Sequence, residues 1–116
     1  MRFHRFEDHA AVAPRGHEGF SSKRLVNSAN GGDGSVSITH ATIAPGGTSG
    51  LHSHDGSVQI YVGLEGSLTV GDGETEYQLT PLATVVFEIG SPHFVENRGN
   101  TPARALVITA PELRRG

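Results

Sequence analysis

The sequence contains no cysteine among its 116 residues. Without cysteine, neither a disulfide framework nor a thiolate metal site can form. Any metal ion must therefore be held by nitrogen and oxygen donors. This absence directs attention to the seven histidines of the chain.

The chain also lacks an excess of positive charge and any long hydrophobic run. Nine Lys and Arg stand against twelve Asp and Glu, a formal net charge of −3, so there is no basic stripe of the kind that nucleic acid requires. Residues 1–16 alternate charged and single apolar residues and have no apolar stretch of signal-peptide or membrane-spanning length. We expect a cytoplasmic protein with no nucleic-acid partner and no membrane association.

Helical periodicity is scarce as well, and the pattern that remains is that of an all-β protein. Sixteen glycines and six prolines divide the chain into short segments, and most of these segments are rich in Val, Ile, Thr, Phe and Tyr, as strands are. The length suits one domain that buries roughly two thirds of its surface. Many short antiparallel strands in one small domain indicate a sandwich or a closed barrel. Strands are expected at 22–28, 35–44, 57–65, 67–71, 75–80, 84–89, 93–97 and 103–110, and turns at 31–34, 45–47, 71–73 and 97–100.

The expected strand at 57–65 has two unlike faces, because side chains alternate along a strand. Gln59 and Tyr61 share one face with a glycine, whereas Val58, Ile60, Val62 and Leu64 form the other. The first face would line an interior that contains polar groups. The apolar second face needs a cover, either another layer of the chain or a second subunit, and we expect a homodimer.

Two histidines separated by one residue, His52 and His54, can reach one ion, because their side chains project from the same face of an extended backbone. Such a pair alone is often a coincidence of surface histidines. Here the surroundings are regular: Gly46 precedes His52 by six residues, Gln59 follows His54 by five, and Gly66 follows Gln59 by seven.

This spacing resembles the first motif of the cupin superfamily, which runs glycine, five residues, His-x-His, three or four residues, glutamate, six residues, glycine. The chain matches it at every position except one, where Gln59 replaces the glutamate. The resemblance implies one metal ion inside a barrel, held by His52, His54, Gln59 and a later histidine.

The second cupin motif has glycine, five residues, proline, one residue, glycine, two residues, histidine, three residues, asparagine. Gly90, His93 and Asn97 match it, whereas Leu82 and Glu88 stand in place of the first glycine and the proline. His93 is thereby implied as the remaining metal ligand.

The resemblance covers about residues 35–110 and implies an all-β, single-domain jelly-roll β-barrel of cupin type. It leaves 1–34 as an N-terminal segment, partly strand, that packs on the barrel or on a dimer partner, and 111–116 as a C-terminal tail. Cupins commonly pair as dimers, which agrees with the two-faced strand.

Glutamine in place of glutamate changes the charge of the implied site. With three neutral imidazoles, a glutamine carbonyl leaves a divalent ion with a net charge of about +2, where a glutamate would leave about +1. We expect weaker metal affinity and stronger polarisation of bound oxygens. A site of three nitrogens and one oxygen suits Fe(II), Mn(II), Ni(II) or Zn(II), and the sequence does not choose among them.

Three functions agree with this site. The set of three histidines and a glutamine is similar to that of small cupins that linearise unsaturated uronates, which implies a Lewis-acid isomerase or lyase acting on a small oxygenated substrate, sugar-derived or an enolisable carbonyl. A dioxygenase that uses Fe, Mn or Ni is a second candidate. A non-enzymatic cupin module that binds a small ligand is the third.

Two further side chains are candidate catalytic residues. Tyr61, two residues beyond the glutamine, could donate to a substrate or could simply pack inside the barrel. His40 could support an acid–base step or could simply bond to a neighbour in its strand. No metal role is assigned to His4, His9 and His17, which lie in the polar N-terminal segment.

Overall fold

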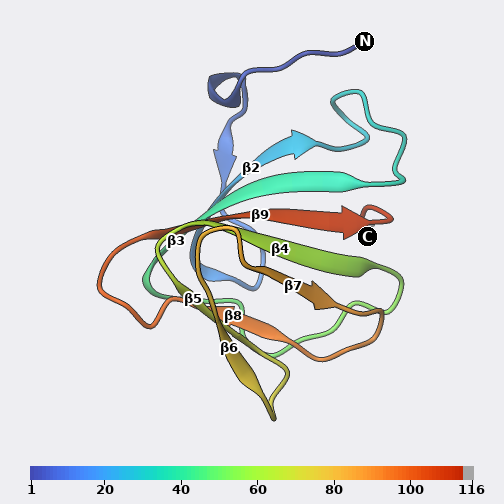
Figure 1. Ribbon diagram of the computed structural model, residues 1–116. Coiled ribbons are helices and arrows are strands. Elements are labelled where there is room, and N and C mark those ends of the chain that lie inside the picture. The colour runs from blue at the N-terminus through green and yellow to red at the C-terminus, as the bar shows by residue number, and fades with distance from the viewer. Residues whose placement is uncertain (114–116) are drawn as a thin grey trace.

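The computed structural model describes residues 1–113 and consists almost entirely of antiparallel strands (Figure 1). Residues 114–116 of the expected C-terminal tail lie outside the described part. No helix within residues 1–113 is long and apolar enough to cross a membrane. The elements are η1, a 3₁₀ helix (Phe6–Asp8), β1 (Ala11–Val12), β2 (Glu18–Val26), β3 (Ser37–Thr48), β4 (Val58–Glu65), β5 (Leu68–Gly71), β6 (Glu76–Leu79), β7 (Thr84–Phe87), β8 (Phe94–Glu96) and β9 (Ala103–Ala110).

Strand β3 joins the two halves of the barrel. Residues 37–43 of β3 pair with β9, and the same strand pairs with β2 on its other edge. Its last residue, Thr48, pairs instead with Glu96 of β8. The strand order β6-β5-β8-β3-β9-β4-β7, with β2 attached at β3 and β1 at β2, closes most of a barrel. The prediction of an all-β, single-domain barrel is confirmed.

Strand β4 has the two faces that its alternation predicts. Gln59 and Tyr61 are buried, at 8% and 3% exposure, and point into the barrel. Val58, Ile60 and Val62 are only half-buried and lie on the outer face. The inner face therefore brings polar groups into the interior, where they can form a site.

The turn predicted at 45–47 is wrong, because these residues lie within β3. Gly46 has a φ of +83°, and the pairing of β2 with β3 shifts register between Glu18 and Phe20. The irregularity is thus absorbed within the paired strands, so Pro and Gly bend β3 without ending it.

The N-terminal segment holds more structure than the sequence pattern indicates. Strand β2 begins at Glu18, four residues before the strand predicted at 22–28, and η1 and β1 are not predicted at all. Pairing with β3 extends β2, and β1 in turn pairs with β2 at Ala11 and Val12. Long-range hydrogen bonds determine where these strands begin and end, and local composition does not predict such bonds.

The hairpin predicted around 71–73 is confirmed. Gly71 pairs with Glu76, and the Asp72 carboxylate accepts hydrogen bonds from the backbone N–H groups of Glu74, at 2.9 Å, and Thr75, at 2.8 Å. An aspartate that caps its own turn in this way fixes the register of β5 against β6.

Leu82, which stands in place of a motif glycine, has the left-handed backbone conformation that favours glycine. Its φ is +66°, the only positive φ of a non-glycine residue among residues 1–113. The Leu82 N–H donates to the Gly63 carbonyl at 2.8 Å, which holds this turn against β4. Because an L-residue is strained in the left-handed region, the chain tolerates a strain here that glycine would avoid.

Candidate metal centre

Three histidines meet at one end of the barrel, and the backbone brings them together. His52 and His93 form an isolated antiparallel bridge, in which His52 N–H donates to the His93 carbonyl at 2.9 Å and His93 N–H donates to the His52 carbonyl at 2.7 Å. His54 follows in the same β3–β4 loop, and Gln59 projects from β4. Loop and strand thus aim four side chains at one point.

The side-chain distances are those of a group that can share one ion. The candidate ligand atoms of His52, His54 and His93 all lie within 4.8 Å of one another. The Gln59 carbonyl oxygen, Oε1, lies 3.2 Å from Nε2 of His93. The structure therefore brings together all four residues that the sequence suggests as ligands.

The hydrogen bonds behind the rings determine which nitrogen faces the group. His52 Nδ1 lies 2.9 Å from the Gly50 carbonyl, and His93 Nδ1 lies 3.0 Å from the Ser91 carbonyl. A neutral imidazole carries one N–H, and a carbonyl can only accept, so both protons reside on Nδ1. The lone pairs on Nε2 of His52 and His93 are then available to a metal ion, an arrangement typical of metal-ligating histidines.

Two contacts in this group are those expected of ligands placed around a cation. His93 Nε2 and Gln59 Oε1 are both acceptors in this arrangement, yet they lie 3.2 Å apart. His54 Nε2 is buried and has no hydrogen-bond partner among residues 1–113. Buried polar atoms are normally satisfied, and a divalent ion would satisfy all three at once. The residues therefore fit the metal that the sequence suggests.

The Gln59 side chain is held in the orientation that this fit requires. Its amide nitrogen, Nε2, donates to Thr109 Oγ1 at 3.2 Å, and the two residues are cross-strand partners in β4 and β9. The carbonyl oxygen is thereby directed toward His93.

Burial keeps His54 and His93 neutral, as a metal ligand must be. Desolvation lowers the pKa of His93 to about 4. The pKa of His54 is lowered as well, first by burial and then by the nearby His52. Phe87 stacks on the His93 ring with a centroid distance of 4.1 Å and an interplanar angle of 8°, which fixes the orientation of that ring.

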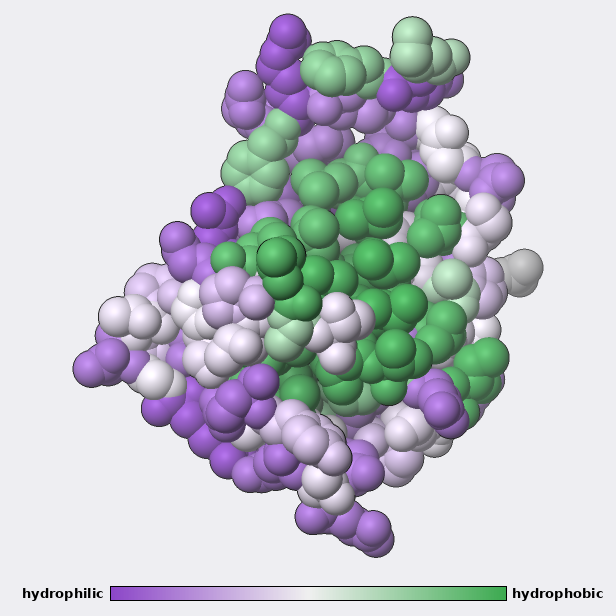
Figure 2. Space-filling view, in the orientation of Figure 1, coloured by the Kyte–Doolittle hydropathy of each residue, from purple (hydrophilic) through white to green (hydrophobic). Residues whose placement is uncertain are grey.

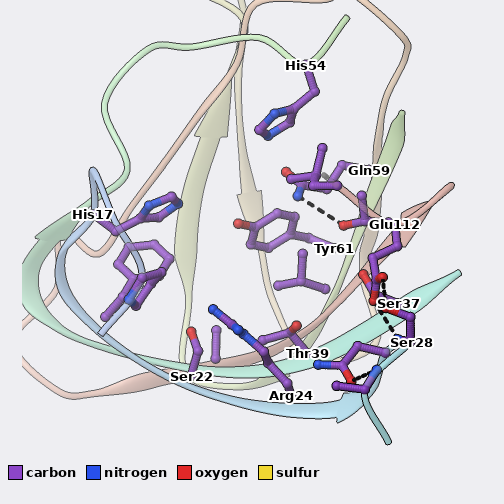
Figure 3. A pocket seen from close by; sticks show the side chains of 18 residues that line it. His17, Ser22, Arg24, Ser28, Ser37, Thr39, His54, Gln59, Tyr61 and Glu112 are labelled. Carbon is purple, nitrogen blue, oxygen red and sulfur yellow. Dashed lines mark hydrogen bonds between the residues drawn. The ribbon is translucent and has the colours of Figure 1, made fainter. Parts of the chain in front are cut away.

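A cavity of about 580 Å³ reaches two members of this group, His54 and Gln59 (Figure 3). Tyr61 lines it as well. The Tyr61 hydroxyl makes no hydrogen bond with other residues in the described chain, and burial raises the pKa of Tyr61 well above its usual value. Tyr61 is therefore a protonated phenol at neutral pH, able to donate to a bound molecule.

His17 also lines this cavity, although the sequence pattern predicts no metal role for it. Its ring centroid lies 5.8 Å from that of His52 and 4.7 Å from that of Phe20, and its Nδ1 lies 2.9 Å from the Arg15 carbonyl. No spacing motif marks His17, because its position depends on the pairing of β2 with β3.

His40 lies away from the cavity. It is buried beneath Phe6, with ring centroids 4.8 Å apart, and its Nε2 accepts a hydrogen bond from Arg104 Nε at 3.1 Å. Its neighbours Thr39 and Ala41 line the cavity, so alternation along β3 turns His40 to the outside of the barrel. The structure does not bring His40 to the candidate metal ligands.

Comparison with known proteins agrees with this fold. Tetracenomycin polyketide synthase protein TcmJ of Streptomyces glaucescens is 32% identical over 102 residues, which are 88% of this chain and 68% of that protein. The solved structure of the polyketide cyclase RemF from Streptomyces resistomycificus has a TM-score of 0.85 at 22% identity, over 97% of this chain and 80% of that one, a likeness of fold alone.

A sugar phosphate isomerase of the cupin superfamily from Silicibacter pomeroyi has a TM-score of 0.69 at 27% identity, over 79% of this chain. The match spans 59% of that structure's length. Residues 39–109 match the family of cupin domains. The chain therefore belongs to the cupin family.

Proposed function

We propose that this cupin binds one divalent transition-metal ion through His52, His54, His93 and Gln59, and that it acts on a small oxygenated substrate as an isomerase or lyase. The observation that carries the proposal is the set of converging acceptors, in which His54 Nε2 is buried without a partner in the described chain and Gln59 Oε1 faces His93 Nε2 at 3.2 Å. An adjoining cavity of about 580 Å³ has room for a small molecule.

The donor set suits Lewis-acid chemistry. A divalent ion held only by neutral donors keeps a charge of about +2 and would polarise a substrate hydroxyl or carbonyl oxygen. Tyr61 would donate a hydrogen bond to a substrate oxygen, because its phenol stays protonated. His17 points into the same cavity (Figure 3), and a histidine can exchange a proton near neutral pH. We assign His17 to the step of ring opening or keto–enol isomerisation that moves a proton, and Tyr61 to the hydrogen bond that holds the substrate oxygen.

Two of the comparisons support this reaction class. The relative from Streptomyces glaucescens is a polyketide synthase protein, and the structure from Silicibacter pomeroyi is a sugar phosphate isomerase. Polyketides and sugars both carry the oxygenated carbons that a Lewis acid polarises.

The metal site is tested by elemental analysis of the protein and of the double variant His52→Ala/His54→Ala. We expect about one metal ion per chain in the wild type and none in the variant. Turnover of unsaturated uronates or enolisable ketones should be lost together with the metal. Metal-replete protein that acts on none of these compounds would contradict the Lewis-acid assignment.

Two other results would point to different functions. Oxygen uptake during turnover, with loss of turnover under anaerobic conditions, would identify a dioxygenase. Ligand binding that survives the double histidine substitution would identify a binding module with no role for the metal.

The outer face of the barrel supports a homodimer. Cross-strand pairing places Ile38, Ile108, Ile60 and Val86 in one row across β3, β9, β4 and β7. Figure 2 shows a broad hydrophobic area on the side of the molecule where these strands lie. A second copy of the chain is the cover that we propose for this face.

Three expectations from the sequence remain predictions. They are the cytoplasmic location, the absence of a nucleic-acid partner and the absence of membrane association.

A further inference from the structure

One positively charged side chain lines the cavity, apart from the histidines of the candidate metal centre. Arg24, on β2, is half-buried and lines the cavity across from His54, with Tyr61 between them (Figure 3). Its guanidinium makes no hydrogen bond or ion pair with any residue between 1 and 113. Two other arginines do have partners: Arg98 pairs with two glutamates, and Arg104 donates to His40.

Strand register explains why Arg24 faces inward. Arg24 pairs with Thr39 of β3, whose side chain also lines the cavity. The preceding residue, Lys23, pairs with His40 and projects to the outer face, where its Nζ lies 4.0 Å from the centre of the Phe6 ring. Alternation along β2 thus gives one cation to each side of the sheet.

The surroundings of Arg24 suit a single negative charge. Hydroxyls of Ser22 and Thr39 line the same part of the cavity. The carboxylate in the lining, Glu112, accepts hydrogen bonds from the N–H of Ser28 at 2.9 Å and from its Oγ at 2.6 Å. A guanidinium offers a planar fork of N–H donors that matches the two oxygens of a carboxylate. A carboxylate carries the single negative charge that one guanidinium balances, whereas a phosphate dianion would keep one charge unbalanced.

We propose that Arg24 binds a carboxylate of the substrate and so determines the substrate class: a small carboxylic acid with a second oxygen function, hydroxyl or carbonyl, directed toward the histidine group. The second half of this statement rests on the proposed metal-dependent function. Arg24 would bind the carboxylate end of the substrate, and the histidine group would bind the other end. Tyr61 lies between the two. Arg24 is then a specificity-determining residue.

The test uses matched probes that differ only in charge, measured by calorimetry on the full chain after loading with zinc. The pairs are glucuronate with glucuronamide and benzoate with benzamide. In the wild type we expect at least one acid to bind about tenfold more tightly than its amide. Arg24→Gln should bring that ratio to about one, and Arg24→Lys should leave an intermediate ratio because it keeps the charge but loses the fork.

Lys23→Gln is the matched control, because it removes a cation from the same strand but from the outer face; it should keep the wild-type ratio. The proposal is overturned if the wild type prefers neither acid, or if Arg24→Gln binds the acid as the wild type does while its thermal unfolding is unchanged. Zinc content, measured on the same samples, reports separately on the proposed function. A wild type that binds no zinc would contradict that function. The ratio of the affinities for the acid and its amide would still test the role of Arg24.

Discussion

Gln59 is the residue at which the chain departs from the usual first motif of its family, and the structure shows a side chain held in place. Its amide nitrogen donates to Thr109 and its carbonyl oxygen faces His93. A glutamine that had lost its role would not need both contacts. The neutral amide is better understood as a proposed metal ligand, which would leave more positive charge on a bound ion than a carboxylate would.

Gln59→Glu should therefore tighten zinc binding, by about tenfold, and change the activity, because the carboxylate neutralises part of the charge of the ion. The Thr109 hydroxyl can donate to the new carboxylate, so the fold should tolerate the change. Competition with a zinc chelator measures the affinity. Gln78→Glu is the control, since Gln78 makes a similar bond to Thr69 at 3.0 Å outside the site. Unchanged zinc affinity in Gln59→Glu would mean that residue 59 does not reach the ion.

Leu82 offers a second prediction at the residue scale. Its side chain is 80% exposed, and its φ is +66°, so the leucine gains little burial and bears the strain of the left-handed region. Leu82→Gly should raise the free energy of unfolding by about 0.5–1 kcal/mol, which is the relieved strain less the entropy of a more flexible unfolded chain. Urea denaturation measures it. Leu82→Ala should give no such gain, because alanine keeps the strain.

His40 is expected to make the stability depend on pH. Its pKa is lowered, first by burial and then by the positive charge of Arg104 and, to a lesser extent, of Lys23. The unfolded chain binds a proton at residue 40 near pH 6.5, whereas the folded chain resists it, so stability should fall as pH decreases below about 6.5. The contribution of neutral His40 is fully present above that pH. Urea midpoints at pH 7.5 and pH 5 should differ less in His40→Gln than in the wild type, both kept metal-free by chelation. Equal differences would contradict this role.

Strand β2 and the segment before it act as one element that closes the barrel over β3. The inner face of β2 supplies Arg24 to the cavity, and the turn before the strand supplies His17. On the outer face, Phe6 from η1 covers His40 and Lys23. The N-terminal segment thus contributes to both sides of the sheet, although it lies outside the two family motifs.

Phe6→Ala should lower the free energy of unfolding by about 1–2 kcal/mol, because it removes an aromatic contact with His40 at 4.8 Å and a cation–π contact with Lys23 at 4.0 Å. Zinc content should not change, since η1 does not reach the metal group. Chemical denaturation with and without the substitution measures the loss. Phe3→Ala is the comparison, because Phe3 is 75% exposed; an equal loss there would show that η1 does not pack specifically.

The whole molecule is a barrel with one polar interior site and one apolar outer face. The inner residues of β4 and β9, such as Gln59 and Thr109, hold the site, while the outer residues of the same strands, such as Ile60 and Ile108, meet across the sheet. The alternation of side chains along these strands therefore provides both the proposed metal site and the proposed dimer surface.

Ile108→Asp should convert the proposed dimer to a monomer, because it places a charge in the middle of the apolar row. Light scattering after size-exclusion chromatography should give half of the wild-type mass. Tyr77→Asp on β6, where the side chain is 67% exposed, should leave the mass unchanged. A wild-type mass of one chain would contradict the dimer.

Local sequence predicts much of the site. His52 and His54 lie one residue apart, and Gln59 and Tyr61 share a strand face, so backbone geometry alone aims each pair in one direction. The family resemblance adds His93 across a long interval. Composition and alternation likewise predict the all-β class, because strand propensity and period are local properties.

Other features depend on contacts between distant segments. Pairing of β2 with β3 brings His17 and Arg24 into the cavity, and alternation along β3 turns His40 out of it. The same pairing carries β3 through Gly46, where composition predicts a turn. The sequence by itself determined the strand class, the alternation and the ligand spacing, because each depends on neighbouring residues. Only the tertiary structure decided what faces the metal group from across the barrel, because that depends on which strands hydrogen-bond and in which register.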